Sequence, residues 1–354
     1  MIALKRRGLG VLGIAGSFVL LLGGVAAAQG YDTSGQEGGL WLPPGASTYT
    51  RDVDFLYKVI FYVVTGMFLL TEGLLIAFCI LYRRRPGHRP DYTHGSNVAE
   101  ITWTVIPALM LLGLALWQIP TWNMIKQHDR FPKGPDVTTV DVMAETFSWS
   151  YRYPGTKELT EEKKYDITVG RLNVPFGNKV VCNLRSRDVI HSMFIPHMRV
   201  KQDAVPGLRQ KLWFEPNRIW LWDIREKKKI WVNDPKAFEP GGAYYDKRVA
   251  VDVSPATTNY QETPKGYEPV VLPNGVRKKV SVLYQGKVLD GQEWDSCDYA
   301  VGIFEIACAE LCGQGHYRMK STMAVLPRAA YEHWVKAEAE EVAEPAPIWK
   351  WWRD

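Results

Sequence analysis

The chain has 354 residues, of which 46% are hydrophobic and 23% are charged. This composition is ordinary for a globular protein of one or two domains. The formal net charge of +5 is too small and too scattered to indicate a nucleic-acid-binding protein. Two basic runs, Lys5-Arg6-Arg7 and Arg83-Arg84-Arg85, instead flank apolar segments, which is typical of a membrane protein.

The N-terminus has the three parts of a secretory signal: the basic run at residues 5–7, an apolar run over residues 8–24, and Ala26-Ala27-Ala28. This pattern predicts a signal peptide over residues 1–28, and a retained membrane anchor is the alternative. Residues 29–52 begin with a stretch rich in Gly and Pro and are expected to form an irregular segment on the outer, periplasmic side of the membrane.

Two apolar stretches follow and predict a hairpin of membrane-spanning helices over residues 53–85 and 100–126. The central part of the first, Val59 to Leu81, is 23 residues long with Glu72 as its one charge, so as a helix it reaches roughly 35 Å. In the second, Pro107 and Pro120 are expected to kink or end the helix. The connection over residues 86–99 follows the arginine run, so it is predicted to be cytoplasmic. Everything after residue 126 then lies on the outer side.

From Asp136 onward the pattern changes to short strands separated by Gly, Pro and Asn, which predicts an all-β sandwich or barrel over residues 130–343. Residues 217–299 carry mixed charge and only isolated strand patterns, so we expect an insertion without a core of its own. A helix is expected from Pro327 to Val342, and residues 344–354 form a Trp-rich tail. The clearest strand patterns lie at residues 137–143, 165–169, 179–184 and 279–284.

Residues 308–319 read Cys-Ala-Glu-Leu-Cys-Gly-Gln-Gly-His-Tyr-Arg-Met, a dense group of metal-binding side chains. Four interpretations are open: a zinc site, a disulfide, a mononuclear blue-copper site, and a copper site with a second thiolate. The thioether of Met319 favours copper over zinc, and copper loops of this kind join the last two strands of cupredoxins. A further histidine is needed upstream, and His191 is the candidate.

The segments Asp188-Val-Ile-His-Ser, Val200-Lys-Gln-Asp-Ala-Val-Pro-Gly and the 308–319 loop together resemble subunit II of the haem–copper cytochrome c oxidases. The resemblance covers the helix hairpin, a cupredoxin-like β domain and the loop. It implies a binuclear copper centre, called CuA, bridged by two thiolates. It also implies a Mg²⁺ held by the Glu310 carboxylate at the contact with subunit I. The implied ligands are Cys308 and Cys312 as bridges, His191 and His316 on one copper each, and Met319 and the Glu310 carbonyl as axial ligands.

Two further matches concern protons and electrons. Glu100 lies near the start of the second apolar stretch, where the family has a carboxylate at the cytoplasmic mouth of a proton pathway; a capping role at the helix N-terminus is the alternative. Phe147, Trp149 and Tyr151 match an aromatic cluster through which electrons enter. The family has Trp at the position of Phe147, so the entry residue stays open, and simple packing at a strand edge is the alternative.

Other residues carry less specific hypotheses. Asp188 and Asp203 match acidic positions near the cytochrome c footprint, or they support His191, or they are solvated surface groups. Cys182 and Cys297 are candidates for a disulfide in an oxidising compartment. His197 lies six residues after His191, but the family pattern does not require it as a ligand.

The resemblance implies the electron-entry subunit of a respiratory terminal oxidase, a multi-pass protein of the bacterial plasma (inner) membrane. Its partners would be subunit I, with its haem and CuB, subunit III, and a c-type cytochrome or similar periplasmic donor. O2 reduction, coupled to proton translocation, would occur in subunit I and not in this chain. The alternatives are a CuA subunit of another membrane reductase, such as nitric oxide reductase, a quinol-oxidase subunit, which lacks copper ligands, and a tethered copper-binding protein.

Overall fold

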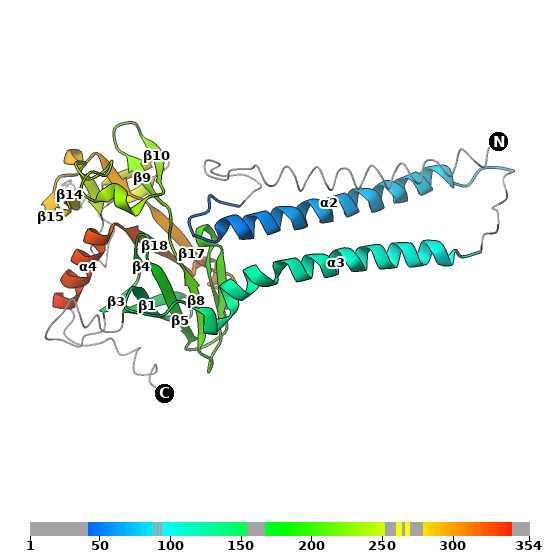
Figure 1. Cartoon of the computed structure of the whole chain (residues 1–354), viewed down its shortest axis with the longest axis horizontal. Helices are drawn as coiled ribbons and strands as arrows, with labels where there is room; N and C mark the ends of the chain where they lie inside the picture. The colour runs from blue at the N-terminus through cyan, green and yellow to red at the C-terminus, as the bar shows by residue number, and fades with distance from the viewer. Residues whose placement is uncertain are drawn as a thin grey trace. The chain divides into compact units, whose positions relative to one another are not determined.

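The computed structural model describes residues 42–87, 89, 92, 94–153, 167–251, 260–263, 266–269 and 279–341 (Figure 1). The predicted signal peptide, residues 29–41 of the outer segment and the Trp-rich tail lie outside the described residues. The described chain forms two compact units, one of residues 51–124 and one of residues 42–50 and 125–341. Each unit is described by itself.

The first unit consists of two long helices, α2 (Thr50–Leu81) and α3 (Asn97–Lys126). At about 1.5 Å per residue they reach roughly 48 and 45 Å, more than the roughly 30 Å of a bilayer core. Their apolar side chains, such as Leu69 and Leu111, are exposed, as expected of helices that face lipid. Helix α2 ends before the arginine run, while α3 continues through Pro107 and Pro120, so neither proline ends the helix.

The second unit is built around a sandwich of two five-stranded sheets, and the predicted all-β, cupredoxin-like domain is confirmed. Strands β2 and β5 of the first sheet contact β18 and β7 of the second. Fully buried side chains, among them Val142, Leu184 and Ile306, fill the space between the sheets. In sheet order, the first sheet is β3 (Ile167–Val169), β2 (Ser148–Tyr153), β1 (Val137–Glu145), β5 (Lys179–Ser186) and β8 (Gln210–Phe214), and the second is β4 (Leu172–Pro175), β18 (Lys320–Leu326), β17 (Ile303–Cys308), β6 (His191–Ile195) and β7 (Val200–Ala204).

Three loops meet at one end of this sandwich. Strands β1 and β5 are parallel and in register, so both end at the same end of the first sheet. The β1–β2 turn and the β5–β6 loop therefore start beside each other. In the second sheet β6 begins where β17 ends, because these antiparallel strands pair Cys308 with Met193. The β17–β18 loop, which holds residues 309–319, therefore lies beside the start of β6. Hydrogen bonds from Thr146 to Asp188 and from Ala309 to Ser192 tie the three loops together.

Six strands between residues 219 and 301 form a sheet with buried apolar side chains, which differs from the expected insertion without a core. Leu221, Val249 and Val282 are fully buried in it. Two of its pairings are hairpins between consecutive strands, but its strands are short and the other three pairings join segments far apart in the chain, so local periodicity does not reveal the sheet. The sheet order is β10 (Lys228–Val232), β9 (Ile219–Asp223), β16 (Tyr299–Val301), β11 (Val249–Val251), β14 (Val280–Tyr284) and β15 (Lys287–Gln292), with β12 (Tyr260–Thr263) and β13 (Gly266–Pro269) as a separate pair.

The remaining elements are one helix and several single 3₁₀ turns. Helix α4 (Arg328–Glu341) follows β18, close to the predicted bounds, and buries Trp334. The 3₁₀ turns are η1 (His128–Arg130), η2 (Pro196–Met198), η3 (Pro235–Phe238), η4 (Trp294–Ser296) and η5 (His316–Arg318).

The hypothesis of a Cys182–Cys297 disulfide is wrong, because both residues are free thiols. Cys182 lies in β5 of the sandwich, whereas Cys297 follows η4 at the edge of the inserted sheet. Both are buried, and burial raises the pKa of Cys297 to about 11. They are therefore protonated packing residues at neutral pH.

Gly302 joins the inserted sheet to the sandwich and gives a test of this arrangement. A Cβ atom at residue 302 would lie 2.0 Å from the Trp220 ring, and the Gly302 N–H donates to the Trp220 carbonyl at 2.8 Å. We expect Gly302→Ala to lower the free energy of unfolding by about 1–3 kcal/mol, because the ring must shift within a packed core. Denaturant titration measures this change.

Gly170→Ala is the matched control, since no atom lies within 4 Å of its Cβ position. Its effect should stay within about 0.5 kcal/mol. Equal effects of the two substitutions would contradict the close packing of Trp220 over Gly302.

Candidate metal centre

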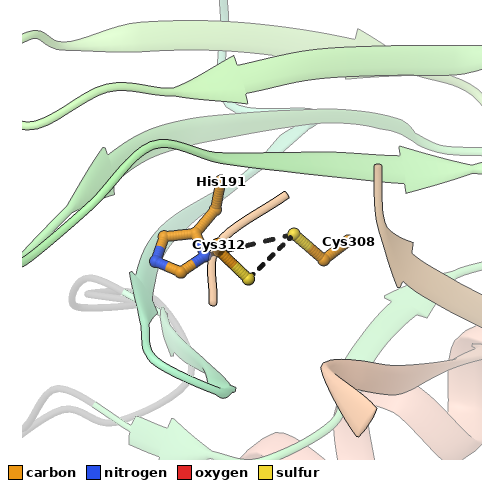
Figure 2. A group of neighbouring side chains, drawn as sticks. All are labelled: His191, Cys308 and Cys312. Atoms are coloured by element: carbon orange, nitrogen blue, oxygen red, sulfur yellow. Dashed lines mark hydrogen bonds between the residues drawn. The ribbon is translucent and has the colours of Figure 1, made fainter. Parts of the chain in front are cut away.

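The two cysteines of the β17–β18 loop face His191 at the end of the sandwich where the loops meet. His191 is the first residue of β6 and is 0% exposed, and Cys308 is the last residue of β17. Figure 2 shows the two thiols and the imidazole pointing toward one another. Their ligand atoms all lie within 4.8 Å of one another, so they form a group that could hold a metal ion.

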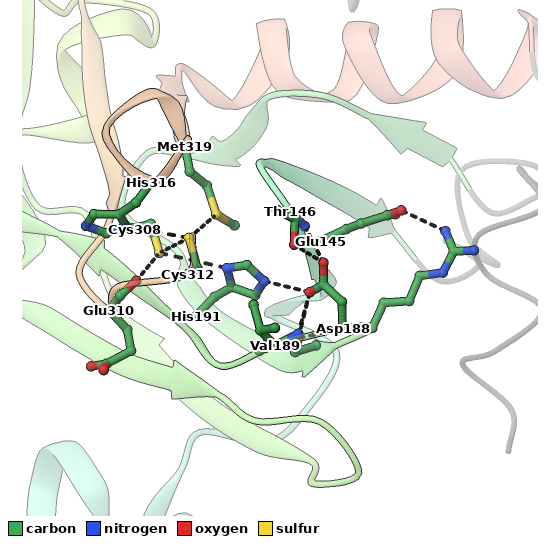
Figure 3. Close-up of polar contacts among 12 residues, drawn as sticks. Glu145, Thr146, Asp188, Val189, His191, Cys308, Glu310, Cys312, His316 and Met319 are labelled. Atoms are coloured by element: carbon green, nitrogen blue, oxygen red, sulfur yellow. Dashed lines mark hydrogen bonds and ion pairs between the residues drawn. The ribbon is translucent and has the colours of Figure 1, made fainter. Parts of the chain in front are cut away.

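Each thiol has an imidazole nitrogen and one further donor beside it (Figure 3). The Cys308 Sγ lies 4.0 Å from His191 Nδ1 and 3.2 Å from the Glu310 carbonyl oxygen. The Cys312 Sγ lies 3.5 Å from His316 Nδ1 and 3.7 Å from Met319 Sδ. The structure thus brings together all six residues singled out in the sequence as copper ligands, in two similar sets.

The two sulfur atoms lie 3.9 Å apart and both cysteines are free. A disulfide needs an S–S distance of about 2.05 Å, so the disulfide interpretation of this loop is wrong. Two thiolates with a thioether form a soft donor set, which suits copper better than zinc. Burial and the neighbouring Cys308 raise the pKa of the Cys312 thiol to about 11, so metal binding would release protons from the pair.

Asp188 fixes the orientation of the His191 ring. Its Oδ1 lies 2.8 Å from His191 Nε2, and it also accepts bonds from the backbone N–H groups of Thr146 and Val189, both at 2.7 Å. Burial alone would raise the pKa of Asp188, but the hydrogen bonds from Thr146, His191 and Val189 outweigh it and hold the pKa well below its usual range. The ionised carboxylate accepts a hydrogen bond from the His191 Nε2–H group, which leaves the Nδ1 lone pair directed at Cys308.

A second contact fixes the start of the loop. The Ala309 N–H donates to the Ser192 carbonyl at 2.9 Å, and the Ser192 hydroxyl donates to Asp203 Oδ1 at 2.7 Å. Of the alternatives left open for Asp188 and Asp203, the geometry favours support of the site. The contacts with Thr146 and Ala309 could not be predicted from the sequence, because they join residues far apart in the chain.

The three aromatic residues of the expected entry region lie in different environments. Phe147, in the β1–β2 turn, is 36% exposed. A Cβ atom at residue 315 would lie 2.5 Å from the Phe147 ring, so the ring packs directly against Gly315. Trp149 is 4% exposed and meets the His191 ring edge-on at a centroid distance of 6.2 Å. Tyr151 is fully buried, which raises its pKa. Phe147 is therefore the member of this group that covers the loop and borders solvent.

Among the described residues, neither of the two predicted glutamates contributes its carboxylate to the group of ligand atoms around the thiols. The Glu310 side chain is exposed and points away from the two thiols (Figure 3). Glu100 lies in the first turn of α3, in the helical unit. Its Oε1 would be 3.2 Å from a Cβ at Gly95, so the carboxylate folds back toward the helix N-terminus, where the helix dipole favours its charge.

Comparison with known proteins gives matches to one family. Family models of the transmembrane and the periplasmic domain of cytochrome c oxidase subunit II match residues 35–120 and 138–222. A Synechocystis cytochrome c oxidase subunit 2 is 29% identical over 57% of this chain and 71% of the relative. A subunit 2 of Alkalihalophilus pseudofirmus is 26% identical over 76% of this chain, which spans about half, 54%, of that relative.

A solved structure, the periplasmic domain of subunit II of cytochrome oxidase of Bradyrhizobium japonicum, aligns with a TM-score of 0.32 and 17% identity. The alignment covers 60% of this chain and 99% of that chain. The match of the periplasmic family model includes His191 and ends before the 308–319 loop. The loop geometry is therefore evidence independent of that match.

Asp188→Ala tests how the site is held. We expect this substitution to lower the affinity for copper by about 10- to 100-fold, because the His191 ring loses the acceptor that orients it. Competition with a copper chelator measures the affinity. Asp188→Asn should recover part of the loss, since its amide oxygen still accepts from Nε2. The matched control is Asp246→Ala, which removes a surface carboxylate bonded to Gln285. An unchanged affinity in Asp188→Ala would contradict the role of Asp188.

Proposed function

Because the chain belongs to the cytochrome c oxidase subunit II family, we propose that it is the electron-entry subunit of a respiratory terminal oxidase. In this proposal it accepts electrons from a c-type cytochrome on the outer side and passes them to haem in subunit I. There, beside CuB, O2 is reduced to water with proton translocation. The relatives named above are oxidase subunits, which favours O2 over nitric oxide as the final acceptor.

The observation that carries the proposal is the arrangement of four donors around two thiols that lie 3.9 Å apart. A pair of thiolates at this spacing suits two copper ions that both sulfurs bridge, with His191 and the Glu310 carbonyl on the Cys308 side and His316 and Met319 on the Cys312 side. Such a binuclear centre would accept and release one electron at a time. The rigid β6 and β17 strands hold the ligands in place, so little rearrangement accompanies each transfer.

Two sides of the site receive different roles in the proposal. Phe147 covers the loop and excludes water where the electron arrives, with Trp149 behind it against His191. Tyr151 supports this strand from the core. The exposed Glu310 carboxylate would hold a Mg²⁺ at the contact with subunit I, which suits a hard oxygen donor. Subunit III is the further expected partner.

In this proposal the chain is a multi-pass protein of the bacterial plasma (inner) membrane, with the β unit on the periplasmic side. This proposal rests on the length of the two helices, their exposed apolar side chains and the arginine run that follows α2. Glu100 would then lie at the cytoplasmic surface, at the start of α3. A carboxylate at this position exchanges protons with bulk water and can load a pathway into subunit I.

Two substitutions test the copper assignment. Cys308→Ser should abolish the binuclear centre and electron entry, because one of the two bridging sulfurs is lost. Met319→Leu should keep both coppers and change the reduction potential, because only a weak axial donor is removed. Copper analysis, EPR and potentiometry of the purified oxidase measure these outcomes. Two electronically coupled coppers in Cys308→Ser would refute the bridging role.

Glu100→Gln tests the proton role separately. We expect it to slow O2 consumption by the oxidase about tenfold or more, because the amide cannot carry a proton, while the copper EPR spectrum stays unchanged. Asp52→Asn is the matched control, since Asp52 is the carboxylate in the first turn of α2. Normal turnover of the Glu100→Gln oxidase would leave only a capping role for this residue.

A further inference from the structure

One face of the metal site is open and largely apolar. We call it the loop face and define it by Phe147, Val189, Gly313, Gly315, Tyr317 and Arg318. The Phe147 ring lies against Gly313 and Gly315. Val189 lies beside the same turn, because its N–H and that of Thr146 both donate to the Asp188 carboxylate. Phe147, Val189 and Tyr317 are 36%, 43% and 67% exposed. Exposed apolar side chains that gather on one face are typical of a surface that binds a partner.

The carboxylates beside this face are already engaged. The β1–β2 turn and the β5–β6 loop contribute Glu145 and Asp188. Glu145 forms an ion pair with Arg187 at 2.9 Å. Asp188 accepts hydrogen bonds from Thr146, Val189 and His191. The Glu145–Arg187 pair has no net charge, and the Asp188 carboxylate keeps its negative charge but is directed at the His191 ring.

The loop itself adds a positive charge to this face. Arg318 is exposed and lies over the Tyr317 ring, at 5.4 Å from its centroid. No acidic side chain forms an ion pair with it in the described part of the chain. The one acidic residue of the 308–319 loop is Glu310, which the proposed function assigns to the contact with subunit I.

From this balance of apolar surface and charge, we infer that the loop face binds an electron donor through apolar contact. The donor is a small cytochrome whose haem edge is surrounded by apolar and neutral or acidic side chains, and not by lysines. This inference rests on the proposed function and specifies the partner of the same site. The charged side chains at this face, Glu145, Arg187, Asp188 and Arg318, sum to zero, so a ring of lysines on a donor would meet no net negative charge, which disfavours the encounter complex.

The salt dependence of electron entry follows from this. Association that is steered by opposite charges falls steeply with ionic strength, whereas apolar docking changes little. Reduction of the oxidase by a donor with an apolar haem edge should therefore change by less than about threefold in kcat/KM between low salt and roughly 0.2 M salt. A lysine-ringed cytochrome c should be at least about tenfold less effective at low salt.

The experiment uses the purified oxidase complex and two probes, a cytochrome c ringed by lysines and a small cytochrome c with an apolar, acidic haem edge. O2 consumption is measured with each probe as a function of salt. Tyr317→Ser should raise KM for the apolar-edged probe about tenfold without lowering kcat, because it removes apolar contact area only. Arg318→Glu should improve the lysine-ringed probe and weaken the apolar, acidic one.

Leu289→Ser is the matched control, because Leu289 is an exposed aliphatic side chain on β15 of the inserted sheet. It should leave KM for both probes unchanged, and the copper EPR spectrum of every variant verifies that the centre is intact. Fast reduction by the lysine-ringed probe that falls more than tenfold with salt would overturn the inference and keep the proposed function. Absence of reduction by either probe, with an intact copper centre, would refute the electron-entry function itself.

Discussion

The site depends on the distance between two thiols. Cys308 and Cys312 are close enough to share metal ions, at 3.9 Å, yet too far apart to form a disulfide. The frame that keeps this distance is the end of β17, which fixes Cys308, and a loop that returns to β18 and carries Cys312. Each thiol then meets one imidazole and one weaker donor, so the donor set has two similar halves. This division is the physical basis for proposing two metals instead of one.

Packing contacts and hydrogen bonds around the loop hold it in this shape. Asp188 is hydrogen-bonded to His191 Nε2, and the Ser192 carbonyl accepts a hydrogen bond from the Ala309 N–H, directly after Cys308. Gly315 has no side chain, so the Phe147 ring can lie directly on the loop. These contacts come from all three loops at this end of the sandwich. The electron would arrive at a surface made of the same residues that hold the ligands, which keeps the path short.

The ligand residues were predictable because five of the six lie within twelve positions of one another, where spacing alone is informative. The sandwich strands were predictable from apolar runs between turn residues. The inserted sheet was predictable only at residues 279–284, because its strands are short and the pairings that join β16 to β9 and β11, and β11 to β14, link residues far apart in the chain. The suggested Cys182–Cys297 bridge failed because Cys182 lies in the sandwich and Cys297 follows η4 beside the inserted sheet. Phe147 packs against Gly315, and Asp188 is hydrogen-bonded to His191. Nothing in the local sequence pattern predicts these two tertiary contacts.

The central claim is that one chain binds two coppers as a single electronic unit. The most direct test is to load the purified full-length chain with copper, count the metal ions, and record the EPR spectrum of the oxidised form. The account predicts two coppers per chain that share one unpaired electron, with hyperfine structure from two equivalent nuclei. One copper per chain with a mononuclear spectrum, or no stable binding, would contradict it.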